Sequence, residues 1–278
     1  MHINYWSEIR KNRIGKMGLA MIAIVVLVAV FAPYIAPYDP WKYMGETLAP
    51  PSSSHLLGLN DTGQDIFSEL IYGTRTTLIT GSLVAMLTSV ISLILGVLAA
   101  MWRGMIERVI LRFIDIMLII PVFLAAILAA SFFRPGIFLM VILLSLLLWP
   151  PGARIIRMQT LSLLQNQHLT AALNFGAGKI YVIFKHIIPD LFPILAANFI
   201  GVIRRAIFME AGLAFLGVFD PALKSWGLML HYAREYIFTG SWLWWLLPVG
   251  FAISFTILGF ALVGYTLESI LDPRLRRF

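Results

Sequence analysis

Long runs of apolar residues with few or no charges constrain this chain more than any other feature. A helix needs about 20 residues to cross the roughly 30 Å of hydrocarbon in a bilayer. Backbone polar groups in lipid must be satisfied within the segment, so each run is expected to form a helix. The sequence therefore predicts an all-α integral membrane protein with six transmembrane helices. The six runs are Met17–Ala36, Leu78–Met101, Ile110–Phe133, Ile137–Ile156, Leu191–Met209 and Trp242–Leu267.

Composition excludes the other broad classes of protein. Hydrophobic residues make up 60% of the 278 residues and charged residues 13%, against about 45–50% and about 25% in average soluble chains. A soluble domain of this length could not bury so much apolar surface. A membrane β-barrel would need alternating segments of about 10 residues, whereas these runs are long and unbroken. The sequence contains no cysteine, which excludes disulfides and thiolate metal sites.

The positions of lysine and arginine predict the orientation in the membrane. Fourteen of the 21 basic residues lie in segments that a six-helix arrangement places on one side, and such a bias marks the cytoplasmic side. Both termini are therefore predicted to be cytoplasmic, as an even number of spans requires. The fourteen are Arg10, Lys11, Arg13, Lys16, Arg103, Arg108, Arg112, Arg154, Arg157, Lys179, Lys185, Arg274, Arg276 and Arg277.

These spans divide the chain into tails, loops and a transmembrane core. The loop after the first span is polar and rich in turn-forming residues, so it is expected outside the membrane. The predicted parts are a cytoplasmic tail over 1–16, a first transmembrane helix over 17–36, an extracytoplasmic loop over 37–77, a transmembrane core over 78–268 and a cytoplasmic tail over 269–278. Within the core, 160–189 is predicted to be a cytoplasmic loop and 210–241 an extracytoplasmic one.

The cytoplasmic loop is the most informative part of the chain, because it is too polar to cross and longer than a minimal turn. A short helix is expected to begin near Thr170 and to end at glycine, which tolerates the left-handed conformation of a helix end. A second helix then runs from Lys179 into the fifth span. A small hinged helix tied to two spans suits transmission of force from a cytoplasmic partner, and an ordinary connecting loop is the alternative. The residues of interest are Thr170, Ala171, Ala172, Gly176, Ala177, Gly178, His186 and Pro189.

This loop resembles the EAA loop of ABC importer permeases. In that pattern Glu-Ala-Ala is followed by a glycine six positions after the glutamate, and by Leu-Pro at the end of the loop. Thr170-Ala171-Ala172, Gly176 and Ile188-Pro189 match this spacing. The first position departs from the pattern, since Thr170 stands where glutamate is usual.

The rest of the chain is similar, in order, to one branch of these proteins, the dipeptide/oligopeptide/nickel permeases, as their second, C-type subunit. The resemblance implies a type I ABC importer permease fold in a bacterial or archaeal plasma membrane. It also implies a second homologous permease subunit, two cytoplasmic ABC ATPase subunits and an extracytoplasmic substrate-binding protein, with peptides or nickel and other metal chelates as cargo. The matching segments are Arg10–Arg13, Ala32–Pro40, His55–Gly58, Gly63–Ser68, Leu70–Arg75, Arg112–Asp115 with Pro121, Glu210–Gly217, Ser225–Gly227 and Leu271–Arg276.

The chain is not expected to be an enzyme. It lacks the Gly-x-x-x-x-Gly-Lys-Ser/Thr loop that cradles nucleotide phosphates; Gly176-Ala177-Gly178-Lys179 is only a partial match. It also lacks His-Glu-x-x-His, and its five histidines are scattered. We therefore expect no catalytic residue, no cofactor, no bound metal and no nucleic-acid partner, and ATP hydrolysis in separate subunits.

Charges at membrane depth are costly, at about 2.5–3.5 kcal/mol near the bilayer centre, and so they are informative. Arg112 and Asp115 lie three residues apart on one helix face and are predicted to form a structural ion pair. Arg204, Arg205 and Glu210 lie near the outer end of the fifth span and are predicted as candidate residues of the translocation path. One of the arginines is expected to face the translocation path, where it would attract an anionic group, and pairing with an acid is the alternative.

Two other functions remain open from the sequence. An ion-coupled carrier working alone would need buried acids, for which Asp115 is a weak candidate, and the chain shows no clear internal repeat. A membrane scaffold without transport activity is the other alternative. Co-purification with ATPase chains and ATP-dependent uptake in liposomes would separate the three.

The predicted orientation can be tested by fusion. A reporter enzyme that is active only outside the cytoplasm should be silent when it is fused after Phe278, because the bias of basic residues holds that end inside. Activity of this fusion would contradict the count of six spans.

Overall fold

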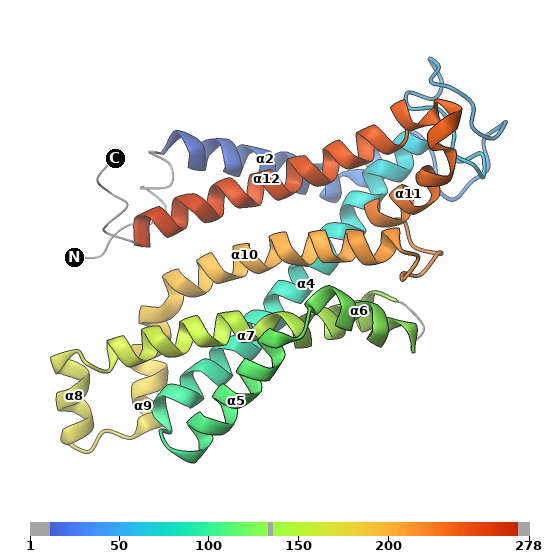
Figure 1. The fold of residues 1–278 in the computed structure, drawn as a ribbon. Coiled ribbons are helices and arrows are strands. Elements are labelled where there is room, and N and C mark those ends of the chain that lie inside the picture. Colours follow the sequence, from blue (N-terminus) through green and yellow to red (C-terminus); the bar gives the residue numbers. More distant parts are fainter. Residues whose placement is uncertain (1–11, 133–135, 272–278) are drawn as a thin grey trace.

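A computed structural model describes residues 12–132 and 136–271 of the chain. Most of the two predicted tails, at positions 1–11 and 272–278, lies outside the described residues. The basic residues of these positions, namely Arg10, Lys11, Arg274, Arg276 and Arg277, therefore lie outside them as well. The described residues form helices joined by loops, without a β-strand (Figure 1). The prediction of an all-α fold is confirmed.

Five helices are long and apolar enough to cross a membrane, and a bent pair of helices gives a sixth crossing if it is counted as one. The apolar runs of the sequence therefore correspond to the spans. Their bounds are α2 Arg13–Val30, α4 Ile66–Met101, the pair α5 Met105–Ile119 and α6 Val122–Ser131, α7 Ile137–Leu163, α10 Ile188–Phe215 and α12 Leu246–Leu271. The shorter elements are α3 Ala32–Ile35, α8 Gln167–Asn174, α9 Lys179–Val182, η1 Ile183–Ile187, α11 Trp226–Ala233, η2 Arg234–Thr239 and η3 Ser241–Leu243.

Helix α4 is longer than predicted, because it begins at Ile66 and runs for 36 residues without a break. At 1.5 Å per residue it is about 54 Å long, well beyond the hydrocarbon thickness. Asp65 caps its start by accepting a hydrogen bond from the backbone N–H of Ser68 at 2.8 Å. Residues 66–77, predicted as part of the loop 37–77, therefore belong to α4.

The third span is broken rather than straight. Helices α5 and α6 are bent by 86° at Ile120 and Pro121. Proline has no N–H to donate and disfavours the helical conformation at the residue before it. Ile120 is accordingly extended, with φ −74° and ψ 126°. The prediction of one continuous helix over 110–133 is thus wrong, although the two helices together are apolar enough to cross a membrane.

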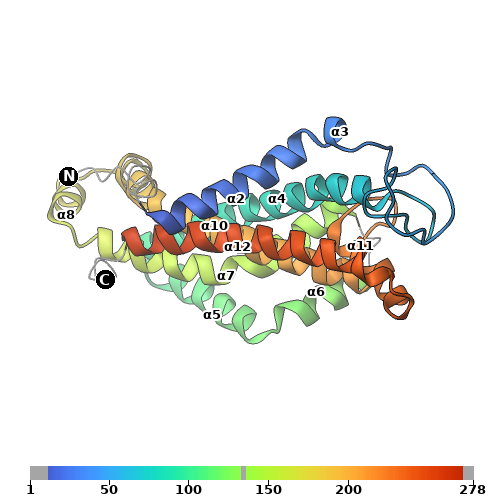
Figure 2. The same cartoon turned by 90° about the horizontal axis from the view of Figure 1, so that it is seen from above.

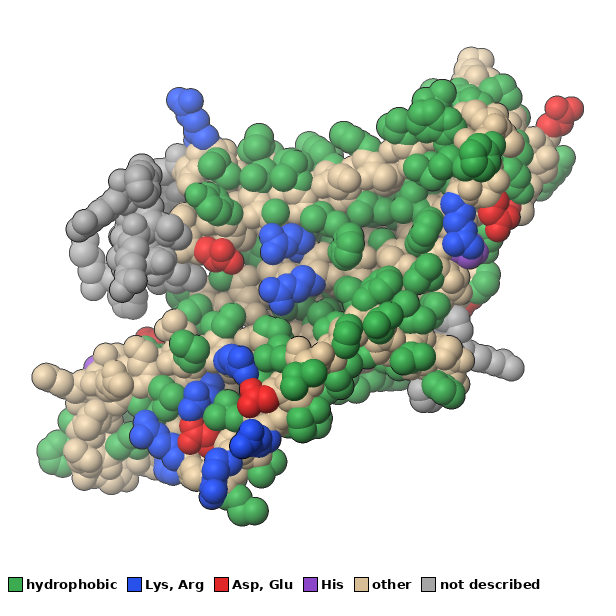
Figure 3. All heavy atoms as spheres, viewed as in Figure 1, with side chains coloured by type: hydrophobic (Ala, Val, Ile, Leu, Met, Phe, Trp, Pro, Cys, Tyr) green, Lys and Arg blue, Asp and Glu red, His purple; other side chains and the backbone are tan. Residues whose placement is uncertain are grey.

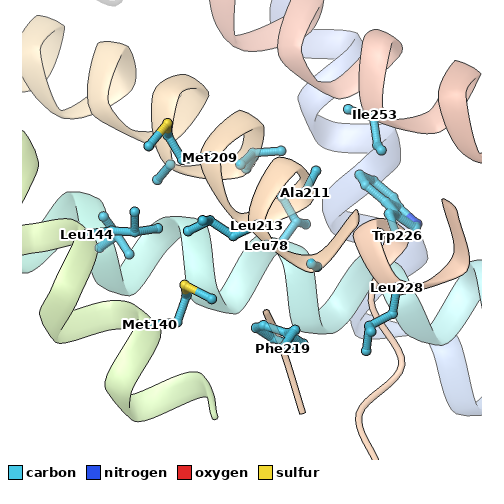
Figure 4. Close-up of a cluster of buried hydrophobic side chains, with 14 of the residues drawn as sticks. Leu78, Met140, Leu144, Met209, Ala211, Leu213, Phe219, Trp226, Leu228 and Ile253 are labelled. Atoms are coloured by element: carbon cyan, nitrogen blue, oxygen red, sulfur yellow. The ribbon is translucent and has the colours of Figure 1, made fainter. Parts of the chain in front are cut away.

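The helices pack into a bundle with distinct ends (Figures 1 and 2). Helices α8 and α9 lie at one end, with the start of α2 and the end of α12, and the loop 36–65 and α11 lie at the other. Helices α4 and α7 make the most extensive contact, and α2 packs along α12. Buried side chains from α4, α7, α10, α11 and α12 fill the core, among them Leu144, Leu213 and Trp226 (Figure 4).

Close approach of α4 and α7 depends on Gly96. A Cβ atom at this position would lie 2.8 Å from the carbonyl oxygen of Ala153 and 2.9 Å from Cβ of Ile156. Gly250 in α12, by contrast, has nothing within 4 Å of its would-be Cβ. Small residues that let backbones approach are typical of helix contacts in membranes.

We predict that Gly96→Ala lowers stability by about 1–3 kcal/mol, because the added methyl group must push apart two backbones. Gly250→Ala serves as the matched control, because it makes the same change in helix propensity and its added methyl group meets no neighbouring atom. Thermal unfolding of the two variants in detergent measures the difference. Equal melting temperatures would show that α4 and α7 do not pack as closely as described.

Candidate functional site

Segment 164–189, the part of the predicted loop 160–189 that follows α7, forms the predicted short helix with a glycine at its end. Helix α8 begins at Gln167, three residues before the predicted start. It ends at a Schellman motif, in which Ala177 N–H donates to Ala172 O at 3.0 Å and Gly176 adopts a φ of +88°. Gly178 has a φ of −62° and instead precedes α9. Gly176 therefore ends the helix as predicted, whereas Gly178 begins the next one.

Leu169 attaches α8 to the bundle. Its side chain is fully buried in a cluster with Val97 and Met101 of α4, Ile156 of α7 and Val182 of α9. Beyond α8 the chain continues through α9 and the π-turn η1 directly into α10, with Pro189 in the first turn of α10. Helix α8 is thus joined to α4 and α7 by packing and to α10 through the chain.

The outward face of this segment is exposed and partly aromatic. Phe175 is 92% exposed, and Ile180, Tyr181 and Phe184 are also exposed. Thr170 and Ala171 lie on the exposed part of α8, and Ala172 is half-buried. His186 is half-buried and lies against the rings of Tyr181 and His168, at centroid distances of 5.9 Å and 6.3 Å.

Ion pairs connect α5 to α7 at the same end of the bundle. Asp115 pairs with Arg154, and Glu107 pairs with Arg157. The predicted pair of Arg112 with Asp115 is therefore wrong in its partner. Spacing along one helix identified a shared face, but a helix packed alongside offers Asp115 a closer guanidinium. Figure 3 shows the basic side chains gathered over this end of the molecule.

The two arginines of the fifth span line a cavity at membrane depth. The cavity has a volume of 310 Å³ and an otherwise apolar lining from α6, α7, α10 and α12. Arg204 is half-buried and Arg205 is exposed, and neither forms an ion pair within the described part of the chain. The lining residues are Val122, Leu148, Arg204, Arg205, Phe208, Met209 and Ile257.

Glu210 does not join the arginines. Its side chain is fully buried, away from that cavity, between α4, α10 and α11. Its carboxylate accepts a hydrogen bond of 3.4 Å from the Thr77 hydroxyl. The prediction that placed all three residues together near the path is therefore corrected: Glu210 holds α10 to α4, whereas the arginines face open space.

A polar network at the α11 end of the bundle was not predicted from the sequence. Lys224 donates to Glu69 at 2.9 Å and to the side-chain oxygen of Gln64 at 2.6 Å, and Asn60 donates to Glu69 at 3.1 Å. Burial raises the pKa of nearby Asp61 above its ordinary value, an effect that two backbone hydrogen bonds and Lys224 reduce. The network joins the loop before α4 to the segment before α11, which are over 150 residues apart in sequence. No local signal could have found that pairing.

Two family models match the chain. Residues 92–277 match the binding-protein-dependent transport system inner membrane component. Residues 4–51 match the N-terminal transmembrane domain of oligopeptide transport permease C. Together the two models cover most of the chain, including the segments around α8 and the arginine cavity.

Curated relatives match along nearly the whole length. The chain is 30% identical to the dipeptide transport system permease protein DppC of Bacillus subtilis, over 98% of this chain and 85% of that one. It is 33% identical to the oligopeptide transport system permease protein OppC of the same organism, over 99% and 92%. It is 34% identical to DppC of Escherichia coli, over 98% and 93%.

A solved structure shares the fold. A chain of the MetNI methionine ABC transporter, in inward-facing conformations, aligns with a TM-score of 0.57 at 18% identity, over 73% of this chain and 94% of that one. The all-helical bundle described above is therefore an ABC importer permease fold. With the family models and the relatives, this shows that the chain belongs to the binding-protein-dependent transport permeases, the inner membrane components of ABC importers.

Proposed function

We propose that this chain is one of two permease subunits of an ATP-driven importer of peptides. The observation that carries the proposal is the placement of α8. This helix stands at one end of the bundle, exposes Phe175 and is tied through Leu169 to two long helices. The relatives named for dipeptide and oligopeptide transport support peptides as cargo over nickel or metal chelates.

The chain would work as the moving part and not as the source of energy. Two cytoplasmic ABC ATPase subunits would dock on α8 and on the matching helix of a second, homologous permease subunit. Closure of the ATPases would displace α8, and the spans would rock between inward and outward openings around the path. In this proposal the spans lie in a bacterial or archaeal plasma membrane, and α8 and both termini face the cytoplasm.

The arginine cavity supports a path shared with the second subunit. An unpaired arginine facing lipid at this depth would cost several kcal/mol, whereas one facing a water-filled path or a partner chain avoids most of that cost. Peptides carry a terminal carboxylate, and a guanidinium binds carboxylates well. Arg204 and Arg205 would therefore guide the anionic end of a peptide through an otherwise apolar passage.

The outer end supports docking of a substrate-binding protein. The buried contacts of Lys224 with Glu69 and Gln64 hold the loop 37–65 and the segment before α11 as one unit. The indole N–H of Trp41 adds a hydrogen bond of 3.2 Å to the carbonyl of Ala222. A firm outer surface of this kind can present a fixed shape to a partner that delivers substrate.

A substitution at Gly176 tests whether α8 couples ATP hydrolysis to uptake. Gly176→Val forces a β-branched residue into a positive φ, at a cost of about 1–3 kcal/mol, and should distort the end of α8. We predict that uptake per ATP hydrolysed falls in reconstituted liposomes while the ATPase rate persists.

Gly178→Val is the matched control, because Gly178 has the ordinary negative φ and both positions have open space around their would-be Cβ atoms. Uptake per ATP should fall much less in this variant. Equal coupling in the two variants would argue against α8 as the docking element.

The arginines are tested together. Arg204→Leu with Arg205→Leu should lower peptide uptake by about tenfold or more, since loss of a charged hydrogen bond costs about 1.5–3 kcal/mol. The double lysine variant keeps both charges and should retain more uptake. Co-purification of the subunits checks assembly. Unchanged uptake by the assembled double leucine variant would remove the arginines from the path.

A further inference from the structure

A second cavity lies between α8 and the ends of α4 and α9, distinct from the arginine cavity of the spans. Its volume is 430 Å³. Arg103, Lys179, Thr170 and Asn174 supply its polar lining, and Ala100, Met101, Leu164 and Leu173 supply the apolar part. One wall is therefore α8 itself, and the opposite wall is the turn between α4 and α5.

The charge of this cavity is positive and unbalanced. No aspartate or glutamate is among its lining residues. Lys179 donates to the carbonyl of Met101 at 3.1 Å and lies 5.3 Å from the ring of Trp102, so its ammonium is held in place with two N–H groups left. Arg103 forms no ion pair within residues 12–132 and 136–271, and the neighbouring Glu107 is engaged by Arg157.

Thr170 cannot supply the missing negative charge. Its hydroxyl lies 3.1 Å from the carbonyl oxygen of Leu164 and 3.2 Å from that of Asn166, so its proton is used within its own turn. Position 170 is where the loop pattern that this chain resembles has glutamate. A carboxylate at 170 would line the same cavity as Arg103 and Lys179. Its absence leaves two cations facing a space without an anion.

We propose that this cavity receives an aspartate or glutamate side chain of the ATPase subunit that docks on α8. The inference rests on the proposed function and adds the chemistry of the contact. A partner protein suits the site better than a lipid headgroup, because α8 forms one wall and stands at the end of the bundle, beyond α4 (Figure 1). An acidic side chain would pair with Arg103 and Lys179 and would select an ATPase that carries acid at that point.

The test uses Thr170→Glu and Thr170→Gln in the assembled permease pair, held in nanodiscs, with binding of its purified ATPase subunits as the readout. Glutamate fills the cavity with a charge that repels the incoming acid, and glutamine has the same size without the charge. The dissociation constant of the glutamate variant should exceed that of the glutamine variant by about tenfold or more. Binding by the wild type should weaken more steeply with salt than binding by the glutamate variant.

Three outcomes would overturn this inference. Equal affinities of the two variants would show that charge at 170 does not matter. Tighter binding by the glutamate variant would show that the ATPase presents a basic side chain to this cavity. The glutamate variant could also bind ATPase more weakly than the glutamine variant only in nanodiscs with anionic lipid, and equally well in neutral phosphatidylcholine. That result would assign the cavity to a lipid headgroup. Failure of the wild-type chain to bind ATPase at all would instead sink the proposed function.

Discussion

Hydrocarbon offers no hydrogen-bonding partner to a backbone, and this constraint shapes the whole molecule. Within residues 12–132 and 136–271, the apolar runs form helices, and irregular backbone lies at the ends of the bundle or next to proline. Pro121 marks the sharp break between α5 and α6, and Pro189 follows a π-turn at the entry of α10. Beside Pro150 in α7, the hydroxyl of Ser92 donates to the carbonyl of Trp149 at 2.8 Å and ties α4 to α7.

The same constraint separates three functional regions along the bundle. A polar network lies at the α11 end of the bundle, where Lys224, in the segment before α11, pairs with Glu69 in the first turn of α4. Between the two ends, Arg204 and Arg205 of α10 line a cavity among apolar side chains. At the α8 end, charge is abundant, and ion pairs hold α5 to α7 while Arg103 and Lys179 line a second cavity. Leu169 joins α8 to α4, α7 and α9 in a buried cluster that is separate from the larger cluster in the core of the bundle.

Features with a local signal in the sequence could be predicted, and contacts between distant segments could not. Gly176 was identified as a helix end because a positive φ favours glycine, and the structure gives it that conformation. The partner of Asp115 was assigned wrongly, because spacing along one helix says nothing about Arg154 on another. The continuity of α4 was also missed, since the apolar run that predicts the span begins only at Leu78, whereas the helix begins at Ile66.

The sequence by itself determined the solvent, the helical class, the approximate spans and the absence of a nucleotide-binding loop, because each follows from composition or from short-range pattern. Tertiary structure alone decided which charges meet, which polar groups are buried and which arginines face a cavity. Those contacts join residues far apart in the chain, as Lys224 does with Glu69. Their energies depend on distance and burial, which a linear pattern does not contain.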